Sequence, residues 1–336
     1  MPRTNQESFT QSWQWQLVRF APHIAIGIVV ILLPPFLPLY IQSLMTKTLI
    51  FAILAMAFDL AIGYTGLLTL GHAAYFGVGG YTIGLLMLHY DITSLWISAP
   101  IAILMATLVA AIFGLIALRV TGFYFIFVTF ALGQLLFSIA FKLDWLKSPG
   151  TEGIVGVSHP DLGLAWFTWN PIYFYYFVFL AFVICFFLLR RLVNSPFGYA
   201  LQGIREAEPR MRVLGYNTWL YRYIAFVVAG AFAGVAGVLF VYHNSIVVPE
   251  HFGVTTSALG WFMVVLGGTG TLYGPVIGTA LIVPLEFYAG IITPERWPLI
   301  LGGAFVLSIM YARRGVGVYL SQLWNRMVYQ LGSAKG

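Results

Sequence analysis

The chain has 336 residues, of which 60% are hydrophobic and 8% charged, and its formal net charge is +6. A soluble domain carries about 25% charged residues, so this composition excludes an ordinary soluble domain. Apolar runs of about 20 residues recur along the sequence, each long enough to cross a hydrocarbon core of roughly 30 Å. Because only helices satisfy every backbone group within one segment, the sequence predicts an all-α polytopic membrane protein.

Ten apolar runs define a predicted membrane domain over residues 23–312. Residues 1–22 lack the apolar core and cleavage site of a signal peptide, so we expect a cytoplasmic N-terminal segment there and a cytoplasmic tail over 313–336. The eighth run is short and is followed by a glycine-rich turn, which predicts a short, glycine-broken helix. The ten runs are His23–Ile41, Leu44–Ile62, Leu67–Leu88, Leu95–Leu118, Phe123–Phe141, Pro171–Leu189, Leu220–Tyr242, Ser257–Leu266, Pro275–Ile292 and Trp297–Tyr311.

The basic residues predict the orientation of the chain, because Lys and Arg are concentrated in cytoplasmic loops. With residues 194–217 inside and every run crossing, all but four of the 17 Lys and Arg residues are cytoplasmic. If the Ser257–Leu266 run turned back instead, the split would be 10 inside to 7 outside. We therefore expect ten spans, both termini in the cytoplasm and an extracellular loop over residues 143–170.

A polar, arginine-rich segment, residues 194–217, lies between two of the predicted spans. Ser195 is placed to cap a helix that begins at Pro196, and apolar residues recur every three positions along that helix. Pro209 interrupts or restarts the helix, and Gly215 is suited to follow its end. The segment is predicted to form two short helices at the membrane surface. An ordinary positive loop that contacts only lipid headgroups is the alternative.

Few residues within the predicted spans are ionisable or able to bind a metal. Asp59 and Glu286 are the only acids in them, and such residues tend to face a cavity or a partner. Each could instead lie near a water interface, and His72 could be an ordinary packing residue. The six histidines show no i, i+4 pairing, so no metal site is expected. Cys185 is the single cysteine and cannot form an internal disulfide.

A glycine-rich turn, Gly267–Gly270, is not followed by the lysine that a phosphate loop requires. None of the lysines in the chain follows a glycine. The sequence therefore predicts no ATP site and no cofactor in this chain. If transport is driven by ATP, the ATPase is a separate polypeptide.

Several motifs resemble the permease family of branched-chain amino-acid ABC importers, to which urea and amide permeases are close relatives. The segment SPFGYALQGIREAEPRMRVLGYN is similar to the coupling helix of that family, although Tyr199 stands where the family has arginine and Ala207 where it has asparagine. Asp59 also replaces an expected asparagine. Further matches are DLAIGYTGLLTLGHAAYFGVGGYT, LRVTGFYFIFVTFALGQ, MVVLGGTGTLYGPVIGTAL and LILGGAFVLSIMYARRGV.

The resemblance implies a second-type permease subunit of an ATP-driven importer in a bacterial inner membrane. Its implied partners are a paralogous permease subunit, two ATP-binding subunits that hold ATP and Mg²⁺, an extracytoplasmic binding protein and membrane lipid, with no nucleic acid. The implied ATPase-coupling residues are Ser195, Gly198, Tyr199, Ala200, Ile204, Arg205, Glu206, Glu208, Arg210 and Gly215. Candidate residues for the substrate pathway are Asp59, Tyr64, Thr65, His72, Tyr75, Gly267, Gly268, Thr269 and Glu286.

Two other classes of function are weighed against this one. An ion-coupled secondary transporter or channel would use Asp59 and Glu286 as ion or proton sites. An intramembrane enzyme would need clustered catalytic groups, and the scattered histidines and single cysteine argue against it. The sequence does not distinguish between branched-chain amino acids, other amino acids, urea and short amides as the substrate. It also does not distinguish a homodimer of permease subunits from a heterodimer.

Overall fold

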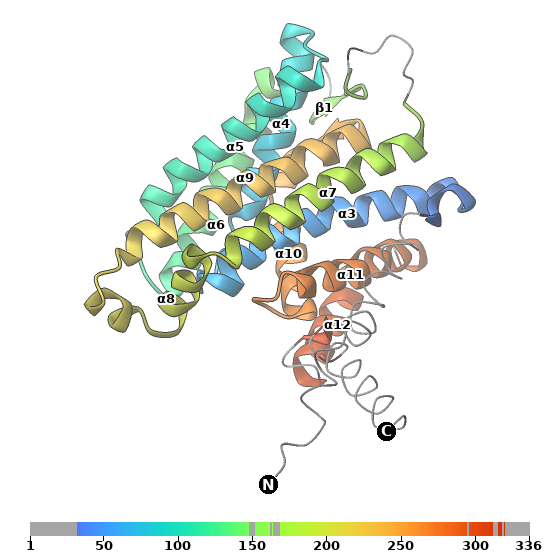
Figure 1. Ribbon diagram of the computed structural model, residues 1–336. Coiled ribbons are helices and arrows are strands. Elements are labelled where there is room, and N and C mark those ends of the chain that lie inside the picture. Colours follow the sequence, from blue (N-terminus) through green and yellow to red (C-terminus); the bar gives the residue numbers. More distant parts are fainter. Residues whose placement is uncertain are drawn as a thin grey trace, which may run out of the picture.

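The protein is described by a computed structural model that covers residues 32–147, 152–161, 163, 169–293, 296–311, 315–317 and 319. Within these residues it is α-helical apart from one short two-stranded ladder (Figure 1). The ten α-helices are α3 (Leu39–Asp59), α4 (His72–Tyr90), α5 (Leu95–Ala117), α6 (Phe123–Lys142), α7 (Pro171–Val193), α8 (Pro196–Val213), α9 (Thr218–Asn244), α10 (Val254–Gly267), α11 (Tyr273–Ile292) and α12 (Trp297–Tyr311).

Short elements connect these helices. A π-helical turn, η2 (Leu60–Tyr64), extends α3 without a break. The strands β1 (Ile154–Val155) and β2 (Ile246–Val247) pair antiparallel, with Ile154 opposite Val247. Three 3₁₀ turns complete the described elements, namely η1 (Pro34–Phe36), η3 (Asp144–Leu146) and η4 (Pro249–Phe252).

Nine of the ten predicted runs correspond to described helices. Most of the first run and all of the segment 1–22 lie outside the described residues. Two predicted starts were wrong by five residues. α3 begins at Leu39, five residues before the predicted Leu44, and α4 begins at His72, five residues after the predicted Leu67. Six described helices are long and apolar enough to cross a membrane: α3 with η2, α5, α6, α7, α9 and α11. α10 and the segment Trp297–Leu307 of α12 are shorter apolar helices.

The helices alternate in direction between two ends of the bundle. One end, here called the hairpin end, carries β1, β2 and η4. The other, the α8 end, carries α8, the end of η2 and the turn between α10 and α11 (Figure 1). α10 starts beside Glu250 of η4 and Leu70 of the stretch before α4, and the turn that follows it lies at the α8 end.

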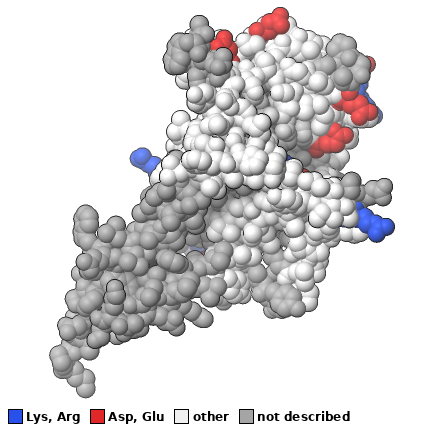
Figure 2. All heavy atoms as spheres, turned by 90° about the vertical axis from the view of Figure 1, so that its right-hand side faces the viewer, with Lys and Arg blue, Asp and Glu red and all other residues white. Residues whose placement is uncertain are grey.

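Charge is distributed unequally between the two ends. Acidic side chains gather on the upper part of the molecule in Figure 2, on the side where β1 lies in Figure 1. The exposed acids of the hairpin end and its loops are Asp91, Asp144, Glu152, Asp161 and Glu250. The α8 end instead carries Arg119, Arg190, Arg191, Arg205, Arg210, Arg212 and Arg222. This asymmetry agrees with a cytoplasmic α8 end under the rule that favours positive charge inside.

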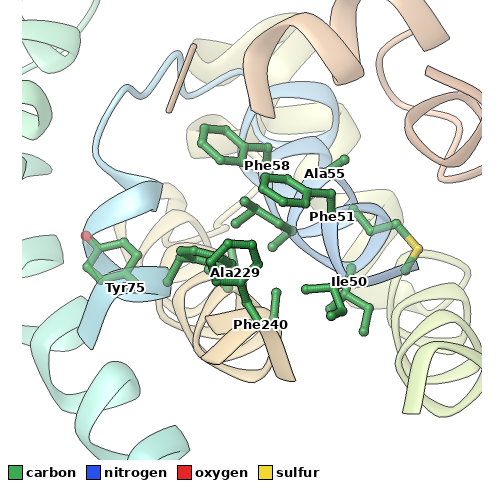
Figure 3. Close-up of a cluster of buried hydrophobic side chains, with 14 of the residues drawn as sticks. Ile50, Phe51, Ala55, Phe58, Tyr75, Ala229 and Phe240 are labelled. Carbon is green, nitrogen blue, oxygen red and sulfur yellow. The ribbon is translucent and has the colours of Figure 1, made fainter. Parts of the chain in front are cut away.

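The core of the bundle is formed by α3, α4 and α9 (Figure 3). Phe51 of α3 packs edge-on against Phe240 of α9, and Phe76 of α4 packs against both rings. A Cβ at Gly237 would lie 1.9 Å from the carbonyl oxygen of Phe76, so α4 and α9 touch through their backbones. Close approach of this kind is how membrane helices associate where lipid removes the hydrophobic driving force.

The outer helices have the opposite distribution of buried residues. In the apolar window of α3, 78% of residues are buried, against 22% in α6 and 28% in both α5 and α7. Their exposed side chains are mostly Leu, Ile, Phe and Trp. α5, α6 and α7 therefore present an apolar surface of the kind that lipid or another membrane subunit covers.

Candidate functional site

Helix α8 begins as the sequence predicts. Ser195 caps it, because its Oγ accepts the backbone N–H of Gly198 at 3.4 Å and donates to the Leu192 carbonyl at 2.6 Å. The helical conformation is interrupted at Ala207, with φ −153° and ψ 77°, two residues before Pro209. Proline cannot continue the hydrogen-bonding pattern and crowds the residues before it. The prediction of two short helices is confirmed, and Gly215 follows the second with φ +87°.

The two sides of α8 differ in burial. Leu201 and Ile204 are buried against the membrane helices. A Cβ at Gly198 would lie 2.1 Å from the Val193 carbonyl oxygen, so the first turn is packed against the end of α7. Ala200 is also buried. The outward side carries Tyr199, whose exposed fraction is 63%, together with Glu206 and Arg210.

Glu208 holds the second part of α8 to α9. Its carboxylate accepts hydrogen bonds from Arg212 at 2.6 Å, Arg222 at 2.6 Å and Thr218 at 3.1 Å. Partial burial raises the pKa of Glu208, but the charge of Arg222 and the hydrogen bonds from Arg212, Arg222 and Thr218 outweigh it, so the pKa lies below its ordinary value. Glu208 is thus engaged within the chain.

Arg205 is exposed, but its side chain reaches from α8 to η2, where its Nη1 donates to the carbonyl oxygen of Gly63. Its aliphatic stem lies against Gly66, where a Cβ would come within 2.9 Å of Arg205 Cγ. Gly66 has φ +74°, a conformation that glycine adopts without the steric cost of a side chain. Arg205 therefore occupies a space that the glycines of the α3–α4 connection leave open.

Asp59 connects the same region to the turn between α10 and α11. It is fully buried, and its two carboxylate oxygens accept the backbone N–H groups of Gly270 at 2.6 Å and Leu272 at 3.1 Å. A Cβ at Gly270 would lie 3.1 Å from Nη1 of Arg205. We call this meeting point the junction; its members are Asp59, Gly63, Arg205, Gly270 and Leu272.

The α10–α11 turn is compact. A Cβ at Gly267 would lie 1.8 Å from the Gly274 carbonyl oxygen, and Gly268 has φ +109°. Thr269 is exposed, while Gly267 and Gly268 are buried. Gly315 packs on the turn from the C-terminal side, since its Cβ would lie 2.2 Å from the Cα of Gly268. The glycines here serve close packing of two helix ends.

A non-helical stretch, residues 65–71, connects η2 to α4 and lies among membrane helices. Its backbone groups find partners in side chains: the Leu70 N–H donates to Thr129 of α6 at 3.4 Å, and the carbonyl oxygens of Leu70 and Thr69 accept from Ser257 and Trp261 of α10 at 2.6 and 3.1 Å. Thr65, a candidate pathway residue, bonds the Ala61 carbonyl, and Tyr64 is buried beside it. Irregular backbone at membrane depth is tolerated only with such partners.

His72 and Tyr75 lie in an aromatic cluster and form no hydrogen bond to the described residues of the junction. The His72 ring packs against Phe58, Tyr75 and Phe226 with centroids 5.1, 5.4 and 5.3 Å away. Its Nδ1 is 3.3 Å from the Thr69 hydroxyl, and its Nε2 has no partner among the described residues. The packing alternative considered for His72 agrees with these surroundings.

Glu286 does not meet Asp59. It lies in α11 and forms an ion pair of 3.3 Å with Lys47 of α3. Lys47 is also 5.6 Å from the centre of the Phe51 ring. The two intramembrane acids are therefore in separate places, and each has its own partners.

Two further features of the structure leave a pattern in the sequence. Gly63 and Gly66 border Arg205 of α8, and two glycines so close together in a turn indicate that another part of the chain approaches the backbone there. On α6, Gln134, Ser138 and Lys142 recur every four residues and line a groove of about 690 Å³. Ser138 and Lys142 are exposed, and none of the three side chains has a hydrogen-bond or ion-pair partner among the described residues.

No grouping of three or more potential metal-ligating side chains occurs in the described part of the chain.

Comparison with known proteins identifies related sequences. The family model of the branched-chain amino acid transport system permease component matches residues 40–311. The high-affinity branched-chain amino acid transport system permease protein LivM of Escherichia coli K12 is 30% identical over 313 residues, covering 87% of this chain and 72% of that protein. LivM of Salmonella typhimurium LT2 is 29% identical over the same coverage.

A more distant relative comes from Methanocaldococcus jannaschii. Its probable branched-chain amino acid transport permease protein LivM is 26% identical over 266 residues, covering 68% of this chain and 75% of that protein. No solved structure matches the chain.

Proposed function

The chain belongs to the permease component family of branched-chain amino acid transport systems, and on this premise we propose that it carries branched-chain amino acids into a bacterial cytoplasm as the LivM-type subunit of an ATP-driven importer. A permease component provides the membrane pathway and is not the catalytic subunit. Related amino acids or small amides are the substrates to be tested against the branched-chain ones.

The observation that carries the proposal is the outward side of α8. Tyr199, Glu206 and Arg210 are exposed on a helix whose other side is fixed to the membrane domain by Leu201, Ile204 and the Glu208 network. A rigidly held helix with free charged groups is suited to receive a mechanical displacement from a soluble subunit. We propose that two ATP-binding subunits, which carry ATP and Mg²⁺, dock here.

The proposal places both termini and α8 in the cytoplasm of a bacterial inner membrane. The ion-coupled alternative is weakened because Asp59 and Glu286 are already engaged, one by backbone N–H groups and the other by Lys47. An extracytoplasmic binding protein would deliver substrate to the hairpin end, where the exposed acids gather (Figure 2).

Three polar side chains on one face of α6, those of Gln134, Ser138 and Lys142, support the presence of a second permease subunit in the assembly. Unpaired Gln134 and Ser138 side chains on a membrane helix are costly in contact with lipid and favour a protein neighbour or a water-filled path. We propose that this face of α6 lies against the paralogous permease subunit.

Reconstitution tests the proposal. The chain is co-expressed with candidate permease, ATPase and binding-protein subunits and purified into proteoliposomes, and uptake of radiolabelled leucine is measured with and without ATP. We expect uptake that requires ATP and binding protein and that isoleucine and valine inhibit more strongly than alanine or urea. Uptake by this chain alone, driven by an ion gradient, would contradict the proposal.

A charge reversal at α8 tests the docking surface. Glu206→Arg changes a side chain without an internal partner, so we expect an unchanged melting temperature and assembled permease subunits, but loss of ATP-driven uptake. Glu206→Gln is the matched neutral control. Normal uptake in the Glu206→Arg complex would remove the evidence for docking at this surface.

A further inference from the structure

Adjacent arginine and glutamate residues of α8 face in different directions. Arg205, Glu206 and Arg210 are all exposed, but Arg205 donates to the Gly63 carbonyl, whereas Glu206 and Arg210 have no partner within the described structure. Successive residues of a helix are separated by about 100° around its axis, so neighbours in sequence serve different surfaces. The bond to Gly63 therefore distinguishes Arg205 from Glu206 and Arg210 on the same helix.

The Gly63 carbonyl is suited to accept this bond. Carbonyl groups in the last turn of a helix lack an intrahelical donor, and Gly63 is the penultimate residue of η2. Arginine presents five N–H donors on a planar group, and a hydrogen bond from a charged donor is stronger than a neutral one. Arg205 thus joins α8 to the end of α3 by a directional contact.

The contact between Arg205 and Gly63 is linked to a second pair of helices, α10 and α11. Asp59 lies one turn before Gly63 on the same continuous helix and holds the N–H groups of Gly270 and Leu272. Arg205 also borders Gly270 directly, and there is no free space at Gly63, where a Cβ would lie 2.1 Å from Asp59 Oδ1 and 2.3 Å from the Gly270 nitrogen. Close packing of this kind transmits displacement instead of absorbing it.

We infer that Arg205 is a positioning residue that couples displacement of α8 to the inner ends of α3, α10 and α11 through the junction, and that it is not itself an ATPase contact. This inference rests on the proposed function and adds the route by which the motion enters the membrane domain. The hydrogen bonds of the junction lead to the α10–α11 turn, a route separate from the Glu208 network that joins α8 to α9.

The test compares two identical substitutions on the same helix. Arg205→Gln removes the internal contact, and Arg210→Gln, the matched control, removes an outward charge. In the reconstituted complex we expect Arg205→Gln to retain its ATPase subunits and their ATP hydrolysis but to lower uptake per ATP by about tenfold, the factor expected from one lost charged hydrogen bond. Arg210→Gln should instead weaken retention of the ATPase.

Arg205→Lys provides a graded control, because lysine keeps the charge but not the planar donor geometry. We expect intermediate uptake per ATP. Loss of ATPase retention in Arg205→Gln to the extent seen in Arg210→Gln, or unchanged uptake per ATP in Arg205→Gln, would overturn the inference while leaving the proposed function in place. Absence of ATP-driven uptake by the unmodified complex would overturn both.

A distance measurement distinguishes transmission from loss of folding. Spin labels at Thr269→Cys in the turn and Asp91→Cys at the hairpin end, with the native buried Cys185 replaced by alanine, report movement of the turn. We expect ATP to change this distance in the complex with Arg205, and the distance to stay unchanged with Arg205→Gln. An equal change in both complexes would overturn the inference.

Discussion

Asp59 and Gly270 are 211 residues apart in the chain and are joined by a hydrogen bond of 2.6 Å from the Gly270 N–H to the Asp59 carboxylate. Together with the bond to Leu272, this contact gives a buried acid two backbone donors. A buried carboxylate whose two oxygens accept backbone N–H groups is suited to stabilise a turn. An ion site would instead need carboxylate oxygens that are free to bind the ion.

Asp59→Asn tests whether this acid braces the turn or binds an ion. Asparagine, the residue expected at this position from the family resemblance, keeps one acceptor oxygen. We expect ATP-driven uptake close to that of the original complex. Asp59→Ala leaves both N–H groups unsatisfied, which should lower the free energy of unfolding by about 1–3 kcal/mol for each group and reduce the melting temperature. Equal loss of uptake in Asp59→Asn and Asp59→Ala would argue for an ion or proton role.

The Glu208 network makes the stability of α8 depend on pH. Because the pKa of Glu208 is lowered in the folded protein, its contribution is fully present above the unfolded value of about 4.5 and is lost as the pH falls through the lower folded pKa. Glu208→Gln should therefore lower the melting temperature at pH 7 and flatten its decline below pH 4.5. Melting is followed by intrinsic fluorescence in detergent, and an unchanged pH profile would contradict the assignment.

Glu206→Gln is the control for that measurement. The two glutamates are two positions apart, but Glu206 has no internal partner in the described structure. We expect it to leave the melting temperature unchanged at every pH tested.

The ion pair between Lys47 and Glu286 predicts strongly non-additive substitutions. Removing one partner leaves the other charge partly buried and unpaired, which costs more than removing both. We expect Lys47→Met and Glu286→Leu each to lower the melting temperature, and the double variant to recover most of the loss, with a coupling free energy of about 0.5–3 kcal/mol. Additive losses in this double-mutant cycle would show that the pair is not coupled.

Close contact between α4 and α9 predicts different effects for two glycine substitutions. Gly237→Ala forces a methyl group against the Phe76 carbonyl, so we expect a loss of about 1–3 kcal/mol. Gly290→Ala in α11 has open space around its Cβ and should be neutral or stabilising by up to about 1 kcal/mol. Thermal unfolding of both variants measures the difference, and a similar melting temperature for the two would contradict the packing described here.

Local features of the sequence predict the helices well. Length and apolar composition locate the runs because membrane helices must span a fixed thickness. Ser195, Pro209 and Gly215 predict the start, interruption and end of α8 because each acts on its own backbone. The start of α4 was misplaced because Leu67, Leu68 and Leu70 are as apolar as helical residues, and only tertiary contacts with Thr129, Ser257 and Trp261 reveal the non-helical conformation.

The junction could not be predicted from local patterns. Which charged residue of α8 reaches Gly63 depends on how the helix rotates when Leu201 and Ile204 are buried. Partners of Asp59 come from a turn more than two hundred residues away, and no spacing in the sequence indicates that distance. The roles proposed for the pathway and coupling residues therefore stay predictions for the experiments above.

The hydrogen bonds of residues 65–71 have a consequence for how the chain is made. The Thr69 and Leu70 carbonyl oxygens receive their donors from α10, 192 and 187 residues later in the sequence. During synthesis, the first helices enter the membrane long before α10 leaves the ribosome. The newly inserted N-terminal half therefore depends on temporary partners for these carbonyls, such as water, lipid headgroups or an insertase, until the late helix arrives and completes its structure.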